Sequence, residues 1–211
     1  MERFMLTPVV AAELGRVRLT PVRASDTERV YQICQHPAIQ AYTTLPSPYE
    51  HEHAVSFCEE LTRRAWQAFG AGGLPALAGL EWRELVWAIR LSPEPGDDDG
   101  LVGCVGIKAW FNPNGESAGY GEIGYWLDER YWHRGLMTAA VKRVLEFAFY
   151  PDGLLDYDRV TWRAHLENHA SKAVAQRCGF HYTGPTECDG HPAWSAEIRR
   201  GDPMEPDDSW Q

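Results

Sequence analysis

The sequence lacks an apolar run of the roughly 18 residues that a membrane-spanning helix needs. It also lacks an excess of basic residues, with 20 Lys and Arg against 30 Asp and Glu in 211 residues. A protein that grips the nucleic-acid backbone needs a basic face, so this balance argues against one. The first residues, MERFMLTPVVAAELG, lack the sustained apolar core of a signal peptide. We therefore expect a cytoplasmic protein that binds neither membranes nor nucleic acids.

Cysteine is scarce and scattered. The sequence contains an odd number of cysteines and no Cys-x-x-Cys motif; they are Cys34, Cys58, Cys104, Cys178 and Cys188. This spacing is typical of buried thiols in a reducing compartment. Because no Cys/His cluster is present along the sequence, we expect no structural zinc and no other metal.

The formal charge of −10 comes mainly from two segments. PEPGDDDG (93–100) and GDPMEPDDSWQ (201–211) each hold four acids and no base, which leaves 30 − 8 = 22 acids against 20 bases elsewhere. The sequence thus predicts a solvated acidic loop and a flexible acidic tail over 201–211. With 44% hydrophobic residues, residues 1–211 are expected to form a single domain with its core in 15–200.

Apolar periodicity predicts an alternation of helices and strands. The Gly- and Ala-rich segment 70–80 predicts a flexible loop, and Asn168 and Gly179 are expected to cap one helix at its two ends. The expected strands are 17–21, 85–91, 101–111, 120–127, 159–166 and 191–200, and the expected helices are one after Ser25 or Asp26, then 47–69, 135–150 and 168–180. This order is typical of an α/β protein with a mixed sheet.

Two short motifs lack the context that their usual chemistry requires. GESAG (115–119) matches the hydrolase pattern around a nucleophilic serine, here Ser117, but a turn precedes it and a strand follows. GYGEIG (119–124) matches a dinucleotide fingerprint, yet the strand continues where a helix should open. A serine hydrolase therefore remains only a rival hypothesis.

The stretch YWHRGLMTAAVKR (131–143) places rings and positive charge where an apolar helical stripe begins. The first N–H groups of a helix have no partner within it, and the helix dipole adds partial positive charge there. Gly135 lets a ligand approach the backbone, Arg134 and His133 add donors, and Thr138 adds a hydroxyl. This arrangement favours a pyrophosphate cradle. The alternative is an ordinary strand–turn–helix connection with a solvated arginine.

Two longer segments carry a family resemblance. YGEIGYWLDERYWHRGLMTAAVKRVLEFAF (120–149) and RVTWRAHLENHASKAVAQRCGFHYTG (159–184) together resemble the GNAT N-acetyltransferase superfamily, and look closest to its RimJ/RimL branch, which acetylates ribosomal-protein N-termini and other amines. The resemblance implies an α/β fold of the α+β type: a mixed, mostly antiparallel twisted sheet flanked by helices. It also implies acetyl-CoA as the acetyl donor.

The resemblance further implies which residues contact coenzyme A. Backbone amides around the helix start would hold the pyrophosphate: His133, Arg134, Gly135, Leu136, Met137 and Thr138. The strand before that helix would pair with the pantetheine arm through Tyr125, Trp126 and Leu127. The start of the later helix would add contacts from Asn168 and Ser171. The family signature Gln/Arg-x-x-Gly-x-Gly/Ala departs here at Trp132 and Met137. The tyrosine that many members use as an acid is Ala175 in this chain, and the branch offers Ser171 instead.

The attacking amine must be neutral, so a base would accelerate transfer by roughly 10²- to 10⁴-fold. Glu122 is the candidate base, and Glu187 and Asp189 are alternatives. Glu122 could equally be an exposed strand glutamate without a catalytic role. Tyr42, Trp110 and Phe111 are candidates for an acceptor pocket or simply core residues.

The sequence thus predicts an N-acetyltransferase that acts on a primary amine, either a protein N-terminus or a small molecule. A homodimer is left open. The rival from another class is a non-catalytic acyl-CoA-binding module. The acidic segments favour a cationic acceptor through long-range attraction.

Overall fold

The computed structural model describes residues 6–11, 15–81, 83–92, 100–150 and 154–210. Eight strands form one sheet in the order β1-β2-β3-β4-β5-β6-β8-β7. The strands are β1 Leu6–Ala11, β2 Gly15–Pro21, β3 Glu84–Ser92, β4 Leu101–Phe111, β5 Ser117–Leu127, β6 Arg159–His165, β7 His181–Cys188 and β8 His191–Arg199. Neighbouring strands are antiparallel except β5 and β6, which are parallel. The predicted mixed, mostly antiparallel sheet is confirmed.

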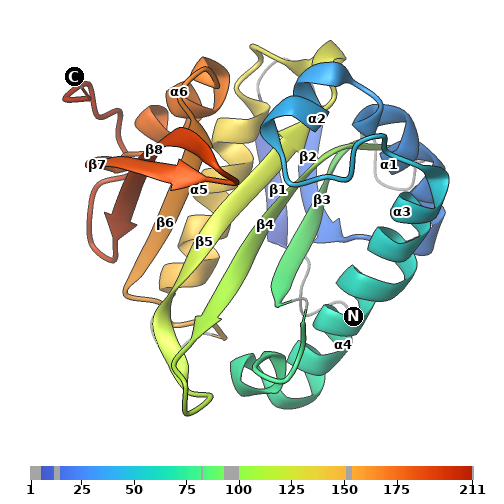
Figure 1. The fold of residues 1–211 in the computed structure, drawn as a ribbon, viewed down its shortest axis with the longest axis horizontal. Helices are drawn as coiled ribbons and strands as arrows, with labels where there is room; N and C mark the ends of the chain where they lie inside the picture. The colour runs from blue at the N-terminus through green and yellow to red at the C-terminus, as the bar shows by residue number, and fades with distance from the viewer. Residues whose placement is uncertain (1–5, 12–14, 82, 93–99, 151–153, 211) are drawn as a thin grey trace.

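Helices cover both faces of the sheet (Figure 1). They are α1 Thr27–Cys34, α2 Pro37–Tyr42, α3 His51–Val55, α4 Thr62–Gly72, α5 Leu136–Phe149 and α6 His169–Arg177, with π-helical residues Ser56–Leu61 joining α3 to α4 and a 3-10 turn, η5, at Glu129–Tyr131. In the view of Figure 1, α5 lies behind β5 and β6. Among the described residues, no helix has both the length and the apolar character to cross a membrane.

Alternate residues of β3 separate two apolar clusters. Val86 and Ala88 pack with the residues of α1, α2 and α3, whereas Trp87 and Ile89 pack with those of α4 and α5. Because side chains alternate along a strand, these clusters lie on opposite faces of the sheet. We call them the α1 face and the α5 face.

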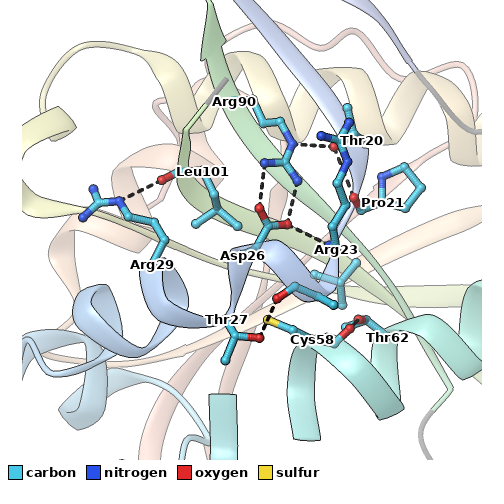
Figure 2. A network of polar contacts seen from close by, with 12 residues as sticks. Thr20, Pro21, Arg23, Asp26, Thr27, Arg29, Cys58, Thr62, Arg90 and Leu101 are labelled. Carbon is cyan, nitrogen blue, oxygen red and sulfur yellow. Dashed lines mark hydrogen bonds and ion pairs between the residues drawn. The ribbon is translucent and has the colours of Figure 1, made fainter. Parts of the chain in front are cut away.

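A buried ion pair fastens the start of α1 to the sheet (Figure 2). The Arg90 guanidinium donates two hydrogen bonds to the Asp26 carboxylate at 2.8 and 2.6 Å and a third to the Thr20 hydroxyl at 2.7 Å. Ser25 or Asp26 was expected to cap this helix; Asp26 occupies the N-cap position of α1, but its side chain makes no cap hydrogen bond to the helix. Its carboxylate instead accepts from the backbone N–H of Arg23 at 2.7 Å.

Two segments that were predicted to be flexible contribute side chains to the core. In the segment 70–80, α4 continues to Gly72, and the turn Leu74–Leu77 buries Leu74 and Leu77 in the core. In the tail, Trp210 is buried and its indole N–H donates to the carbonyl of Phe180 at 2.8 Å. In both segments apolar side chains find partners that only the folded chain provides.

Candidate functional site

The start of α5 is open to a ligand. Its N-cap, Gly135, has φ +73° and no side chain, so no side-chain oxygen caps the helix. His133 also has a positive φ of 60°, which is uncommon for a residue other than glycine. Left-handed residues therefore flank Arg134 on both sides, and turns of this kind can direct successive backbone N–H groups at an anion. His133, Arg134 and Gly135 are exposed, while Leu136 and Met137 bury their side chains and offer only backbone.

The loop before α5 is fixed at both ends. The Trp132 indole N–H donates to the carbonyl of Leu127, the last residue of β5, at 2.7 Å. Asp128 is buried and accepts hydrogen bonds from Arg29 of α1 and from Arg130. Trp132, which replaces the polar residue of the family signature, therefore supports the loop. A polar residue is not required for that role.

β5 and β6 separate beside this helix start. They pair only from Tyr120 to Glu122 on β5 and from Arg159 to Thr161 on β6, and the two strands diverge in Figure 1. Within the part of the chain that the structure describes, the rest of β5, residues 123–127, has no strand partner on its β6 side. An extended chain can add to such a strand edge through main-chain hydrogen bonds. Tyr125, Trp126 and Leu127, the predicted pantetheine contacts, lie on this edge, with Tyr125 and Trp126 pointing to opposite faces.

A hydrogen-bonded group closes the α5 face of this split. Asn168 caps α6 as predicted, its side-chain oxygen accepting from the N–H of Ser171 at 3.1 Å. The Ser171 hydroxyl accepts from the Trp162 indole N–H at 3.1 Å and donates to the Tyr125 hydroxyl at 3.0 Å. The Tyr125 hydroxyl donates to the Ser171 carbonyl at 3.2 Å. Burial raises the pKa of Tyr125, so its phenol keeps the proton at neutral pH.

The Tyr125 hydroxyl was missed by the sequence analysis, which treated this residue only as a pantetheine contact. Ala175, where many family members carry the acidic tyrosine, is buried. Tyr125 instead brings a phenol to the first turn of α6 from the neighbouring strand. The sequence signal was the absence of a tyrosine on α6, and the register of β5 is what places the Tyr125 phenol beside Ser171.

Glu122 lies on the α1 face, where Arg163 holds it. The guanidinium donates to both carboxylate oxygens, at 3.0 and 3.1 Å. A bidentate pair of this kind is strong and directional. The predicted base is therefore an ion-paired carboxylate rather than a free strand glutamate.

A second carboxyl group on the same face, Glu84, was not predicted. Cross-strand pairing aligns Glu84, Lys108 and Glu122 in one row across β3, β4 and β5. Glu84 lies over Gly106, where an added Cβ would come within 2.2 Å of its carboxylate oxygen. Burial, opposed by Lys108 and reinforced by Glu122, raises the Glu84 pKa from 4.5 to about 7. Gly106 and Gly124 pair with each other beside this row. Because neither has a side chain, neither adds one to the surface of the sheet at that point.

The predicted acceptor residues do not form one cluster. The Tyr42 ring lies edge-on to His165, with 6.1 Å between ring centroids. Trp110 stacks on Tyr120 with the Lys108 ammonium 5.2 Å from its ring. Phe111 packs against the opposite cluster, as its alternative interpretation as a core residue expects. A role of Tyr42 and Trp110 in binding the acceptor stays a prediction.

Ser117 does not occupy the position of a hydrolase nucleophile. It is the first residue of β5, exposed, and its hydroxyl accepts from the N–H of Gly119 at 3.1 Å. A strand, not a helix, follows it, so the strained strand-to-helix turn of hydrolases is not formed here.

A sheet that splits between two parallel strands, with an uncapped helix start beside the split, is the architecture expected of a GNAT acetyltransferase domain. Comparison with protein families agrees: residues 16–181 match the family described as acetyltransferase (GNAT) domain, and the chain belongs to this family.

Among curated proteins, the chain is similar to YdaF of Bacillus subtilis (strain 168), whose name describes a ribosomal N-acetyltransferase, with 37% identity over 59 residues. It is also similar to YjcK of the same organism, whose name describes an N-acetyltransferase, with 32% identity over 87 residues. The matched segments cover 28% and 41% of this chain. They span only 31% and 45% of these relatives.

Solved structures share the fold over nearly the whole chain. RimL, a ribosomal L7/L12 alpha-N-protein acetyltransferase solved with coenzyme A, superimposes with a TM-score of 0.66 at 16% identity, covering 92% of this chain and 98% of RimL. RimJ of Mycobacterium smegmatis, solved with CoA-disulfide, gives 0.67 at 23% identity, covering 92% and 87%. At these identities the likeness concerns the fold.

Proposed function

We propose that the chain is an acetyl-CoA-dependent N-acetyltransferase that acetylates a primary amine. The observation that carries the proposal is the uncapped start of α5 beside the unpaired edge of β5. The helix start offers N–H donors and partial positive charge to a pyrophosphate, and the strand edge offers main-chain partners to the pantetheine arm. Residues His133 to Thr138 would hold the pyrophosphate, and residues Tyr125 to Leu127 would pair with the pantetheine arm.

The acetyl group would then lie where β5 and β6 separate. The hydroxyls of Ser171 and Tyr125 would lie on its α5 side, and the carboxylates of Glu84 and Glu122 on its α1 side. The amine nitrogen attacks the thioester carbonyl, the new C–N bond forms, and the C–S bond breaks to release the CoA thiolate. On the α5 face, Ser171 and Tyr125 offer hydroxyl protons to that thiolate. On the α1 face, we propose that Glu84 or Glu122 accepts the proton of the amine, with Glu187 and Asp189 as the alternatives.

The acceptor would approach from the α1 face, because both carboxylates lie there. A cationic amine is attracted to Glu84 and Glu122 and loses its proton at the site. One relative is named a ribosomal N-acetyltransferase and one structural neighbour a ribosomal alpha-N-protein acetyltransferase, so a peptide N-terminus heads the panel of acceptors to test. Small-molecule amines form its second half.

The proposal is tested by following release of free CoA thiol from acetyl-CoA in the presence of N-terminal peptides and small amines. We expect amine-dependent release that falls in Gly135→Val, because a branched side chain resists the left-handed conformation at the helix start. Gly201→Val, at another positive φ in the tail, is the matched control. Binding of acetyl-CoA without thiol release across a broad panel would instead favour the non-catalytic binding module. Unchanged activity in Ser117→Ala would remove the hydrolase alternative.

A finer test addresses the acid. We expect Ser171→Ala and Tyr125→Phe each to lower kcat, by up to about 10²-fold, the lower end for general-acid catalysis, because a thiolate needs little help to leave. The KM for acetyl-CoA should change far less than kcat. If both variants instead lost kcat/KM only through a higher KM for acetyl-CoA, with kcat unchanged, the two hydroxyls would only bind the cosubstrate.

A further inference from the structure

Four side chains with metal-binding atoms meet where three strands end on the α1 face. They are His165 at the end of β6, Cys188 at the end of β7, Asp189 in the turn that follows, and His191 at the start of β8. One donor atom each from His165, Cys188 and Asp189 lies within 4.8 Å of the other two. The Cys188 sulfur and an Asp189 carboxylate oxygen are 3.5 Å apart. The rings of His165 and His191 are 4.9 Å apart between centroids.

The sheet order explains this meeting. β8 lies between β6 and β7 and pairs with both. Cys188 pairs with His191, and His165 pairs with Ala193, two residues further along β8. Residues two apart in a strand share a face, so all three side chains project from the same side of the sheet.

The turn between β7 and β8 adds the fourth group. Asp189 and Gly190 both have positive φ, 52° and 78°, as in a two-residue hairpin turn. In this tight reversal the exposed Asp189 carboxylate lies beside the Cys188 sulfur.

The donor set suits zinc. An imidazole nitrogen, a thiolate and a carboxylate are all Zn²⁺ ligands, with bond lengths of about 2.0 to 2.3 Å in a tetrahedral site. Such a site spaces its ligand atoms roughly 3.3 to 3.8 Å apart. The donor atoms here need to close by only about 1 Å, a change within the reach of side-chain rotation. Thiolate and imidazole ligands together favour Zn²⁺ over Mg²⁺ or Ca²⁺.

The neighbouring charges limit the affinity but do not block the site. The Arg163 guanidinium lies nearby, and its charge is engaged by the Glu122 carboxylate and the Glu187 carbonyl. Burial and Asp189 raise the pKa of Cys188, while Arg163 opposes that rise. Because the ion binds the thiolate and displaces the thiol proton, affinity should increase with pH.

We propose that His165, Cys188 and Asp189, with His191 beside them, bind one Zn²⁺ ion at the β6–β7–β8 strand ends. Cys188 is the accessible thiol among the five cysteines, since the other four are buried. His165 supplies the ligand from outside the hairpin, so binding would tie the β7–β8 hairpin to β6. The ion would lie beside the Glu122–Arg163 pair.

The test uses the full chain, stripped of metal and kept reduced, and titrated with Co²⁺ as a spectroscopic substitute for zinc. We expect one equivalent to produce a thiolate-to-cobalt charge-transfer band, which one equivalent of Zn²⁺ then abolishes. Cys188→Ser should lose the band, and His165→Ala should weaken binding by about tenfold or more, at least the loss seen for outer-shell partners. His51→Ala, an exposed histidine on α3, is the matched control and should bind as the wild type does.

Two results would overturn the proposal. One is the absence of any charge-transfer band in the wild type at saturating Co²⁺. The other is an unchanged band in Cys188→Ser with native circular dichroism, because it would place the metal on another thiol. The measurement needs no turnover, so its failure leaves the proposed acetyl transfer untouched.

Discussion

Glu84 and Glu122 are two glutamates in one cross-strand row, and their surroundings give them different chemistry. Arg163 binds both oxygens of Glu122, which stabilises the charged carboxylate. Glu84 is half-buried, and its pKa of about 7 reflects the cost of burying its charge. A base works best when its pKa is close to the working pH. Glu84 is therefore suited to proton transfer, and Glu122 to holding the amine by its charge.

Replacing Glu84 separates these roles. We expect Glu84→Gln to lower kcat/KM by about 10²-fold at neutral pH and to remove an inflection near pH 7 from its pH profile. Glu122→Gln should mainly raise the KM of a cationic acceptor and keep the inflection. Steady-state rates of thiol release from pH 6 to 9 measure both. An inflection that persists in Glu84→Gln and disappears in Glu122→Gln would reverse the assignment.

Stability provides a readout of Glu84 that does not depend on turnover. The folded protein holds this proton more tightly than the unfolded chain, because the pKa rises from 4.5 to about 7. The free energy of unfolding should therefore fall as pH rises between these values. Glu84→Gln should lack this fall. Urea denaturation of both proteins at pH 5 and pH 8 compares them directly.

Sequence reasoning reached Glu122 but not its environment. Glu122 is identified because it lies on the strand before the helix start, a local relation. Arg163 is 41 residues away and Glu84 lies two strands away. These partners depend on register and strand order, which local periodicity does not determine. The same limit hid the His165–Cys188–Asp189 group. Asp189 was predicted only as an alternative base, and the three residues come together because β8 aligns β6 with β7.

At the scale of elements, α5 and α6 were predicted well because each carries local signals: a continuous apolar stripe in one and Asn168 and Gly179 at the ends of the other. The tail carried the opposite signal, four acids and no base, and was predicted to be flexible. The composition of the tail does not reveal that the indole of Trp210 is buried against the core. Trp210 packs against Trp162, with 5.6 Å between ring centroids, and Trp162 donates to Ser171.

The tail should therefore contribute to stability and to the geometry of Ser171. We expect Trp210→Ala to lower the free energy of unfolding by about 3–5 kcal/mol, the usual cost of removing a buried Trp. It should also lower kcat at temperatures where the protein remains folded. Asp208→Asn, an exposed change in the same tail, is the control. Equal stability of the two variants in urea denaturation would show that the tail is only loosely attached.

The attachment of α1 rests on the buried Arg90–Asp26 pair (Figure 2). Removing one partner leaves a buried charge, so we expect Asp26→Asn to cost about 3–5 kcal/mol of unfolding free energy. The double change Asp26→Leu with Arg90→Met removes both charges and should cost less than the single one. Glu146→Gln, in an exposed pair with Arg143, should change stability by about 0.5 kcal/mol or less. Denaturant titration of the four proteins checks this; a double variant less stable than Asp26→Asn would contradict it.

At the scale of the whole molecule, the order of elements was predicted and the path of the sheet was not. Sequence patterns place six of the eight strands in the described residues and miss β1 and β7, and they do not predict that β8 lies between β6 and β7. That placement brings the ends of β6 and β7 together at the cluster. Local alternation does not determine strand order, and the family resemblance implied only a mixed, mostly antiparallel sheet.

The net charge of −10 is a property of the whole chain that bears on the acceptor. A negative protein attracts a cationic amine over distances comparable to the Debye length, about 10 Å at 0.1 M salt. Added salt screens this attraction during the approach and leaves the short contacts of the bound state less affected. We therefore expect the KM of a cationic acceptor to rise as KCl increases from about 0.02 to about 0.5 M, with little change in kcat.

The acidic segment 93–100 allows a matched control for this effect. Replacing Asp97, Asp98 and Asp99 by Asn removes three negative charges and changes none of the residues proposed to bind either substrate. The triple variant should start from a higher KM at low salt and show a weaker dependence on KCl, while a neutral peptide analogue that competes for the site should bind both proteins alike. A KM that does not depend on salt in the wild type would mean that only contacts within the site, such as those of Glu84 and Glu122, select the acceptor.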